Sequence, residues 1–455
     1  MMLTCEAMAE TQEQLIEGLK AFLRIPSVST APKHTADVRR CAEHVREMLV
    51  AAGLQNAQLI EAEGQHPLVY AEWLGAGEGK PTLLFYGHYD VQPADGEWVT
   101  PAFEPSVRDG NIYARGAADD KGQVFLQIKA VERLMERDGK LPVNVRFLIE
   151  GEEEVGGEHI EAFVASGDAR LKADAAVVCD TEMFAPGLPT LCVGLRGIVY
   201  GEILVKSGDT DLHSGMYGGA APNAIMAACE IVTALKDRDG RILIPGFADS
   251  VIPPSAAERA AWDRLPFNEA EYLEKEVKST ALTGEPGYDV FERTWARPTL
   301  EVHGIRGGFT GEGAKTVIPC EALVKVSMRL VAGQTVEVAT RQLAEAVKAV
   351  CPKAVQAEFR PFHGAEPSLV RTDNVFIEKS AQAMQEVFGK ETVYIRSGGS
   401  IPIVGLFERH LGIPSVMMGF GLPDDNLHAP NEKFHLANLF GGIDAMVRYL
   451  ELLGS

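Results

Sequence analysis

Short apolar runs and stretches of helical periodicity alternate along the first part of the chain. Three runs have the length and composition of buried parallel strands: residues 82–86, 143–148 and 175–179. Between them, apolar residues recur at steps of three and four from Val124 to Met135, which predicts a helix with one buried face. The same spacing from Leu436 to Leu450 predicts another such helix. This alternation predicts an α/β domain with a mostly parallel sheet.

From about Gly197 the pattern changes. Strands are predicted at 198–205 and 321–330, and helices at 221–235 and 335–350. This β-α-β-β-α-like order predicts a smaller α+β, ferredoxin-like domain with helices on one face of its sheet. Within it, residues 245–297 are rich in Pro, Gly and acidic side chains, which predicts an excursion of helices and loops.

The length of 455 residues also favours two domains, because a single core usually stops growing well below that size. We predict a main domain formed by residues 1–194 plus 367–455 and an inserted domain formed by residues 195–366. The inserted domain would then interrupt the α/β fold instead of following it.

The composition narrows the classes of function. With 46% hydrophobic and 24% charged residues the chain is ordinary for a globular protein, and no apolar run approaches the ~18 residues of a membrane span. The start, Met1 to Glu6, lacks the basic and apolar regions of a secretory signal, so a cytoplasmic location is expected. The net charge of −21 has the wrong sign for binding phosphates. We therefore expect neither a membrane nor a nucleic acid as a partner.

The seven cysteines are odd in number and contain no C-x-x-C pair. Such a set argues against a disulfide framework and against a sulfur-rich zinc site. We expect buried thiols, with Cys179 close to a possible site because Asp180 follows it.

Six short segments carry histidines and carboxylates of the types that bind metals. They are residues 87–90, 116–122, 152–157, 179–180, 211–215 and 428–432. His88, Glu152–Glu154 and Asp180 each follow one of the predicted strands, and His428 lies beyond the apolar run 415–420. Open α/β sheets bind their ligands beyond the carboxyl ends of the strands. Taken singly, each segment is more typical of a solvated turn or a helix cap, but their order together favours one site.

Two divalent ions ~3.5–4 Å apart need a bridging carboxylate and further His or carboxylate ligands on each ion. We assign Asp119 as the bridge, His88 and Asp180 to one ion, and Glu154 and His428 to the other. Three carboxylates and one hydroxide would balance the charge of two zinc ions, which a buried cleft requires.

Two further carboxylates have different predicted roles. Asp90 lies two residues after His88, where it can accept the free ring N–H and fix the orientation of the imidazole. Glu153 is adjacent to Glu154 but is not needed as a ligand, so it is the candidate general base that activates a metal-bridging water. The combination predicts a two-metal hydrolase.

With these residues in view, the chain resembles the M20 metallopeptidases, in particular the branch of carnosinase-type and cytosolic nonspecific dipeptidases. The resemblance spans nearly the whole chain and involves several motifs in register. They are residues 87–93, 113–122, 153–154, 180, 211–215, 397–402, 428 and 431–432. Three segments of the inserted domain resemble the dipeptidase branch in particular: residues 295–305, 315–319 and 327–330.

The resemblance implies a zinc-exopeptidase-like catalytic domain with two zinc or manganese ions per subunit, and an inserted lid domain that forms a homodimer. It implies that His213 reaches the site of the partner subunit and polarises the scissile carbonyl. It also implies that the substrate is held by Thr316, Arg329, His363, Gly399 and Ser400. Arg329 is a good candidate for the terminal carboxylate, because a guanidinium can bind a carboxylate through two hydrogen bonds.

The leading hypothesis is a metallodipeptidase that hydrolyses the peptide bond of dipeptides and other small peptides. An M20 carboxypeptidase or an N-acyl-amino-acid deacylase is the alternative among enzymes, since it would use the same metals and base on a different acyl group. From another class, an inactive metal-binding or dimerisation scaffold predicts a missing base, yet Glu153 and His213 are both present.

Overall fold

The computed structural model describes residues 10–455 and divides them into two compact units. The first unit runs to Val193 and includes Val370–Ile395 and Leu406–Ser455, and the second comprises Gly194–Leu369 and Arg396–Gly405. The segment Arg396–Gly405, which the sequence-based division assigns to the main domain, groups with the second unit. Cys5 and the start of the chain, which motivated the cytoplasmic prediction, lie outside the described residues.

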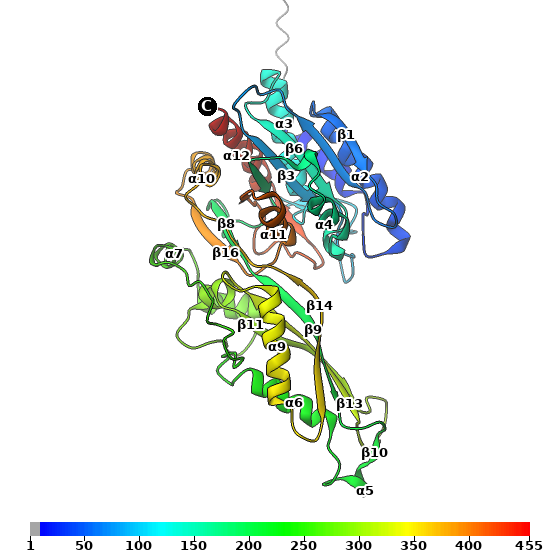
Figure 1. Cartoon of the computed structure of the whole chain (residues 1–455). Coiled ribbons are helices and arrows are strands. Elements are labelled where there is room, and N and C mark those ends of the chain that lie inside the picture. The colour runs from blue at the N-terminus through cyan, green and yellow to red at the C-terminus, as the bar shows by residue number, and fades with distance from the viewer. Residues whose placement is uncertain (1–9) are drawn as a thin grey trace, which may run out of the picture. The chain divides into compact units, whose positions relative to one another are not determined.

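A mixed sheet with a parallel centre forms the core of the first unit (Figure 1). Its order is β1-β2-β6-β3-β7-β17-β8, and β8 also pairs with β16. The last two residues of β8, Gly194 and Leu195, pair with β15, and these residues are grouped with the second unit. The bounds are β1 Gln55–Ile60, β2 Leu68–Trp73, β3 Thr82–His88, β6 Asn144–Glu150, β7 Ala175–Val178, β8 Thr190–Leu195, β15 Ser368–Leu369, β16 Val393–Ser397 and β17 Ser415–Met417.

The four central strands β6, β3, β7 and β17 are parallel. β2 and β8 pair with this centre in antiparallel orientation, and β1 pairs antiparallel with β2. The predicted mostly parallel sheet is therefore confirmed, with antiparallel flanks that the apolar runs did not indicate. The physical reason is connection length: a short loop joins β1 to β2, whereas parallel neighbours require a crossover.

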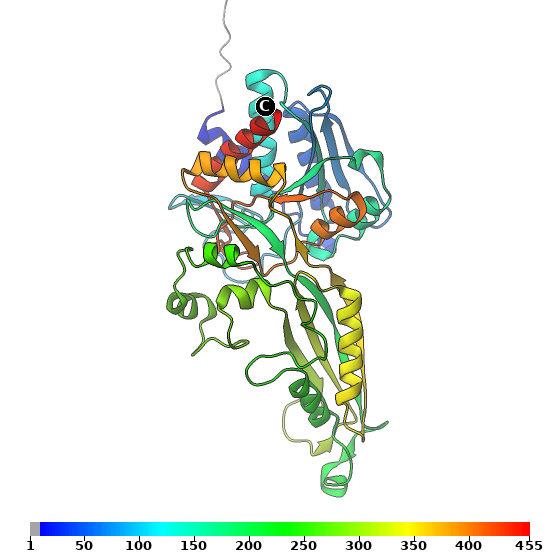
Figure 2. The same ribbon diagram turned by 60° about the vertical axis from the view of Figure 1, so that its left-hand side comes forward.

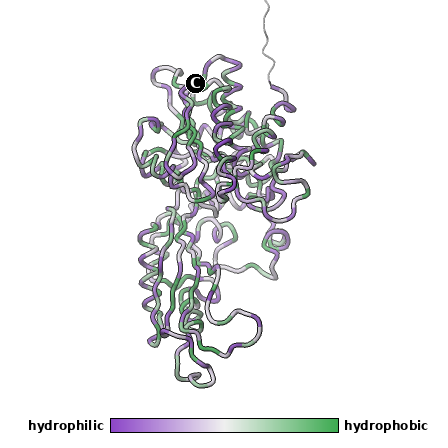
Figure 3. The backbone as a smooth tube through the Cα atoms, turned by 90° about the vertical axis from the view of Figure 1, so that its right-hand side faces the viewer, coloured by the Kyte–Doolittle hydropathy of each residue, from purple (hydrophilic) through white to green (hydrophobic). Residues whose placement is uncertain are grey.

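Helices cover the sheet of the first unit. Those packed on the larger core are α1 Gln12–Leu23, α2 Thr35–Ala51, α3 Lys121–Asp138, α10 Val375–Phe388 and α12 Leu436–Gly454. On the other face, Phe407 of the helical turn Phe407–Leu411 meets the Tyr86 ring edge-on, and α4 (Glu158–Ala165) lies beside that turn. Figure 3 shows hydrophobic stretches running through the interior of this unit. The predicted helices 124–135 and 436–450 are confirmed as parts of α3 and α12.

A small three-stranded sheet, ordered β18-β5-β4, also belongs to the first unit. Its strands are β4 Ser106–Arg108, β5 Asn111–Tyr113 and β18 Lys433–His435. Lys433 pairs with Tyr113. This register brings the loop that follows β5 next to the loop that precedes β18.

The second unit contains a four-stranded antiparallel sheet, ordered β11-β13-β9-β14, with helices on one face (Figure 2). The elements are β9 Gly197–Lys206, α6 Ala224–Leu235, β11 Thr299–Gly307, β13 Glu321–Leu330, α9 Val336–Val350 and β14 Gln356–Ala365. Along β9, Val199, Ile203 and Val205 are buried against α6 and α9, while Tyr200, Glu202 and Leu204 alternate with this face and are only partly buried. The predicted α+β order with one covered face is observed.

Three smaller parts complete the second unit. A two-stranded ribbon pairs β10 (Leu212–His213) with β12 (Val317–Ile318), and α5 (Ser214–Tyr217) follows β10 directly. The excursion contains α7 Ala256–Trp262, α8 Glu269–Glu271 and π-helical turns at Tyr272–Val277 and Glu292–Ala296. The segment Arg396–Gly405 includes all but the last residue of the short helix α11 (Pro402–Leu406).

No helix among residues 10–455 is long and apolar enough to cross a membrane. The six cysteines among residues 10–455 form no disulfide. Cys41, Cys179 and Cys192 are buried as expected, but Cys229 is exposed. The expectation of buried thiols is wrong for Cys229, which lies on the outward face of α6, and holds only in part for Cys320 and Cys351, which are half-buried.

Candidate metal centre

The strand ends of the parallel centre bring three of the predicted site segments together. His88 is the last residue of β3, Asp180 follows β7 by two residues, and Glu153 and Glu154 form a 3-10 turn after β6. The neighbours of β3 are β6 and β7, both parallel to it. Their carboxyl ends therefore meet at one edge of the sheet, which is the position that open α/β sheets use for ligands.

The other two predicted ligands lie on the loops next to the small sheet. Asp119 precedes α3 on the loop after β5, and His428 lies on the loop before β18. His428 and Asn431 have positive φ angles of 57° and 61°, which non-glycine residues seldom adopt. The Asn431 side chain accepts a hydrogen bond from Val99 N (2.8 Å) and donates one to Glu97 O (3.3 Å). The loop of His428 is thus fixed by contacts on both sides.

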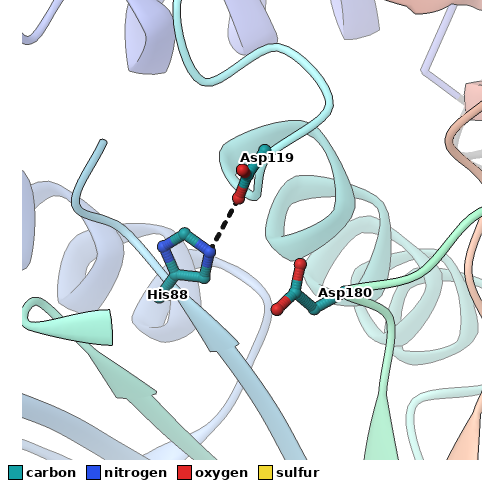
Figure 4. Close-up of side chains that lie close together, drawn as sticks. All are labelled: His88, Asp119 and Asp180. Atoms are coloured by element: carbon teal, nitrogen blue, oxygen red, sulfur yellow. Dashed lines mark hydrogen bonds and ion pairs between the residues drawn. The ribbon is translucent and has the colours of Figure 1, made fainter. Parts of the chain in front are cut away.

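The five predicted ligands form two overlapping groups that could each hold a metal ion. His88, Asp119 and Asp180 form one group, and Asp119, Glu154 and His428 form the other, with the ligand atoms of each group within 4.8 Å of one another. Figure 4 shows the carboxylates of Asp119 and Asp180 toward the same edge of the His88 ring. Asp119 is common to both groups, as its predicted role as a bridge requires.

Asp119 already contacts both histidines. Its Oδ1 lies 3.0 Å from His88 Nε2 and its Oδ2 lies 2.9 Å from His428 Nε2. His428 Nε2 also lies 3.4 Å from Glu154 Oε2. The two oxygens of one carboxylate therefore face the nitrogens of the two groups, one each.

Asp90 is fully buried and organises both neighbouring segments. His88 Nδ1 lies 3.1 Å from the backbone oxygen of Asp90 and 3.4 Å from its Oδ1. The Asp90 carboxylate accepts hydrogen bonds from Glu153 N (3.3 Å) and Glu154 N (3.2 Å). The backbone oxygen is therefore the nearer partner of the ring, and the carboxylate also fixes the turn that carries Glu153.

The electrostatics of the cluster are those of several acids crowded into a buried space. Burial, together with the charge of Asp120, raises the pKa of Asp180 well above its usual range. Burial and the charge of Asp119 raise the pKa of Glu154 to about 8. Burial also raises the pKa of Glu153. For Asp119 burial acts in the same direction, but the hydrogen bonds from His428 and His88 hold its pKa below the usual range.

This donor set fits divalent metal ions. Each group combines one imidazole nitrogen with carboxylate oxygens and contains no sulfur, which suits zinc or manganese. Buried carboxylates of like charge are costly unless cations or hydrogen bonds compensate them. Bound cations would remove the repulsion that raises the pKa values of Asp180 and Glu154.

Glu432 is a structural centre of the site that the sequence did not indicate as such. Its buried carboxylate accepts hydrogen bonds from Gly116 N (2.9 Å), Ala118 N (3.0 Å) and Asp119 N (3.1 Å), and from Arg115 Nη1 (2.7 Å). Its backbone oxygen accepts a bond from Ala114 N (3.1 Å). One side chain thus holds most of the loop that presents Asp119. The motif around His428 contained Glu432, but its role depends on the β18–β5 pairing.

Gln92 is a second residue that the sequence did not single out. Its Nε2 donates a 2.7 Å hydrogen bond to Glu154 Oε2. A hydrogen bond of this kind fixes which carboxylate oxygen faces the ligand group. The only available signal was its position four residues after His88.

The remaining predicted residues belong to the second unit. His213 and Thr316 lie together on the β10–β12 ribbon, where His213 pairs with Val317 and Ser214 N donates to Thr316 O (3.1 Å). His213 is exposed, and its Nδ1 accepts a hydrogen bond from Gly215 N (3.0 Å). Its Nε2 has no partner among the described residues, so the ring offers one nitrogen to another molecule.

Arg329, Ser400 and Gly399 form another cluster of the second unit. Arg329 Nη1 donates a 2.9 Å hydrogen bond to Ser400 Oγ, next to Gly399. His363 lies apart from this bond on β14, where its ring stacks on Tyr200 with centroids 5.4 Å apart. The five predicted substrate-binding residues and His213 thus lie on or next to strands of the second unit or on the segment Arg396–Gly405.

Together, the mixed α/β sheet and a pair of His–carboxylate groups at its strand ends define a metal-dependent hydrolase. Residues 84–452 match the model of peptidase family M20/M25/M40. The chain belongs to this family, and the protein is therefore a hydrolase acting on peptide bonds.

Individual relatives cover almost the whole chain. A Cys-Gly metallodipeptidase, DUG1, of Candida albicans is 31% identical over 99% of this chain and 96% of its own length. The human Beta-Ala-His dipeptidase is 31% identical over 95% of this chain and 88% of its own length. Among solved structures, the M20 family metallo-carboxypeptidase Sso-CP2 from Sulfolobus solfataricus superposes with a TM-score of 0.84 at 30% identity, covering 97% of this chain and 99% of its own.

Proposed function

We propose that this protein is a metallodipeptidase that hydrolyses dipeptides and other small peptides. The observation that carries the proposal is the pair of ligand groups sharing Asp119, with Glu153 on the turn beside them. The relatives named as dipeptidases support the substrate class. The likeness to a metallo-carboxypeptidase keeps that activity as the second candidate.

Two zinc or manganese ions per subunit are the proposed cofactors. His88 and Asp180 would hold one ion, Glu154 and His428 the other, and Asp119 would bridge them. When bound, such ions polarise the scissile carbonyl and lower the pKa of water.

Glu153 is the proposed general base. Its carboxylate takes a proton from the attacking water and then delivers that proton to the nitrogen of the leaving amine. Burial raises the pKa of Glu153 above that of an ordinary glutamate, which favours such an exchange. The Asp90 carboxylate accepts hydrogen bonds from the backbone nitrogens of Glu153 and Glu154. It therefore fixes the position of the proposed base relative to the neighbouring ligand.

Residues of the second unit would select and polarise the substrate. We propose that Arg329, Ser400, Gly399, His363 and Thr316 bind the peptide, with Arg329 at its terminal carboxylate. His213 is proposed to act in the active site of the partner subunit of a homodimer, where its ring N–H donates to the developing oxyanion. Its exposed, unpaired Nε2 supports this role. A cytoplasmic location is proposed as well.

A substrate panel tests the activity. The protein, loaded with zinc or manganese, is assayed on dipeptides, longer peptides with a free carboxyl terminus and N-acyl amino acids. A dipeptidase should give its highest kcat/KM on unblocked dipeptides. Preference for long peptides or for N-acyl amino acids would select the carboxypeptidase or the deacylase instead. No hydrolysis of any of them would reject all three.

Mixing two inactive variants tests the dimer. His213→Ala subunits retain Glu153, and Glu153→Gln subunits retain His213. In a random mixture of exchanging subunits, half of the dimers are mixed and each has one complete site, so activity should return to about a quarter of wild type. Activity that stays at the level of the separate variants, under conditions where subunits exchange, argues that His213 does not act across a dimer.

A further inference from the structure

Two arginines of the second unit lack the acidic partners that most arginines of this chain have. Arg329 lies on β13, and Arg196 lies between β8 and β9. Neither forms an ion pair with a carboxylate of residues 10–455. In a chain with 64 acidic residues and a net charge of −21, two neighbouring cations without a counter-ion are unexpected.

Both arginines contact the short segment Gly398–Ser400. Arg196 Nε donates to Gly398 O (3.0 Å), its backbone N donates to Gly399 O (3.0 Å), and its backbone O accepts from Ser400 Oγ (2.5 Å). Ser400 Oγ in turn accepts from Arg329 Nη1 (2.9 Å). Ser400 is therefore the link between the two arginines.

The pKa values of both guanidinium groups are lowered. Burial, followed by the charge of Arg329, lowers the pKa of Arg196 to about 10. Burial also lowers the pKa of Arg329. Glu301, followed by Tyr272, acts in the opposite direction on the pKa of Arg196, but the Glu301 carboxylate is already bound by Lys236 Nζ at 2.9 Å. The pair thus remains positively charged and uncompensated at neutral pH.

A purely structural role would leave fewer unused donors. A guanidinium carries five N–H groups. In the described part of the chain, Arg196 uses only its Nε and Arg329 only one Nη1 bond. Arg196 is partly buried, and its two terminal nitrogens have no acceptor among residues 10–455, so they remain accessible to an anion from outside the chain. An anion bound between the two groups would satisfy them.

We propose that Arg196 is a second cation of the carboxylate-binding site and, through Gly398 and Gly399, the residue that positions Ser400 there. The ligand it selects is a peptide with a free terminal carboxylate. This inference rests on the proposed dipeptidase function, because it assigns the residues that distinguish a free carboxyl end from a blocked one. Arg196 directly precedes β9, and Ile198 of β9 pairs with Arg329 of β13, so one sheet of the second unit carries both cations.

The test compares a dipeptide with the same dipeptide carrying a C-terminal amide. Wild type should prefer the free carboxylate. Arg196→Gln should lower kcat/KM for the free dipeptide by about 10- to 100-fold, mostly through KM, with a much smaller effect on the amide. The preference for the carboxylate should therefore collapse. Arg196→Lys should restore part of the preference, because the charge remains while the Nε bond to Gly398 is lost.

Arg238→Gln is the matched control, because Arg238 is an exposed arginine of the same unit. It should leave the preference unchanged. If Arg196→Gln lowers kcat/KM equally for the free dipeptide and for its amide, or lowers it for neither, Arg196 takes no part in recognising the carboxylate. The proposal is then overturned. If Arg196→Gln does not fold, the proposal is tested with Arg196→Lys, which should lower the ratio of kcat/KM for the free dipeptide to kcat/KM for the amide. An unchanged ratio in Arg196→Lys would overturn the proposal.

Failure of the proposed function is distinguishable from failure of this inference. If wild type cleaves neither substrate, the dipeptidase assignment fails. Calorimetry with a free amino acid and its amide then tests the arginine pair directly in wild type and Arg196→Lys. Selective binding of the amino acid that weakens in the variant supports the pair, and equal binding of both ligands overturns it.

Discussion

The candidate residues of the two units differ in how they are fixed. In the first unit His88 and Asp90 are buried, and each is held by several protein partners. In the second unit His213, Thr316 and His363 are exposed on strands or ribbons and have few polar contacts of their own. The first unit is therefore pre-organised for chemistry, whereas residues of the second unit gain their contacts from a substrate or another chain.

This contrast predicts different consequences of mutation. Changes in the first unit should alter metal content, stability or the chemical step. Changes in the second should alter substrate binding and transition-state stabilisation while the fold and metal content stay as they are. Each of the following experiments tests one side of the contrast.

The largest expected effect is that of Glu153→Gln. Removing a general base should lower kcat by about 10²- to 10⁴-fold, because the amide cannot take the proton of the attacking water. Metal content, measured by atomic emission, should stay as in wild type, since Glu153 belongs to neither ligand group. The exposed Glu158→Gln, on the next turn, is the control and should keep the wild-type rate. A Glu153→Gln protein with a near-normal kcat would remove Glu153 from its proposed role.

Glu432→Gln should be the most destabilising of these changes. The substitution takes the charge from a buried carboxylate that faces Arg115 and three backbone N–H groups. Breaking a buried pair of this kind costs about 3–5 kcal/mol. Urea unfolding should show this loss, and metal affinity should fall because the Asp119 loop is no longer held. The exposed Glu391→Gln serves as the control. An unchanged unfolding midpoint would show that the loop does not depend on Glu432.

His213→Ala tests the second unit. Loss of one donor to an oxyanion lowers kcat by about 10²- to 10³-fold. Because His213 is exposed, the unfolding midpoint and the metal content should not change. His410→Ala, another exposed histidine, should have no effect on kcat. Lost metal or stability in His213→Ala would contradict the contrast between the units.

Gln92→Ala should have the smallest effect. It removes the 2.7 Å hydrogen bond to Glu154 without removing a ligand. Losses of this kind weaken metal affinity or activity by about 10- to 100-fold. Competition with a metal chelator measures the affinity, and the exposed Gln382→Ala is the control. Unaltered affinity would mean that Glu154 is oriented by other contacts alone.

The sequence could predict the parallel centre and the candidate ligands because each depends on a local pattern. The runs that became β3, β6 and β7 are continuous apolar segments, and a metal-type side chain follows each within a few residues. The shortest strands were less visible: β15 of the antiparallel flank has two residues and β17 of the parallel centre has three, too few for a period.

The roles of Glu432 and Arg196 could not be predicted, because both arise from contacts between segments far apart in sequence. Glu432 meets Asp119 across 313 residues, and Arg196 meets Gly398 across 202. The backbone oxygen of Asp90 as the nearer partner of His88 was also beyond a spacing argument, since spacing does not distinguish main-chain from side-chain acceptors.

The separation of Asp119 from His428 by 309 residues has a consequence for biosynthesis. When the ribosome has made Asp119, His88 and Asp180, the second ligand group still lacks its histidine, and the carboxylate that holds the Asp119 loop does not yet exist. A nascent chain can therefore not assemble the hydrolytic centre early. The complete set of candidate ligands can form only once these distant parts of the chain have folded together.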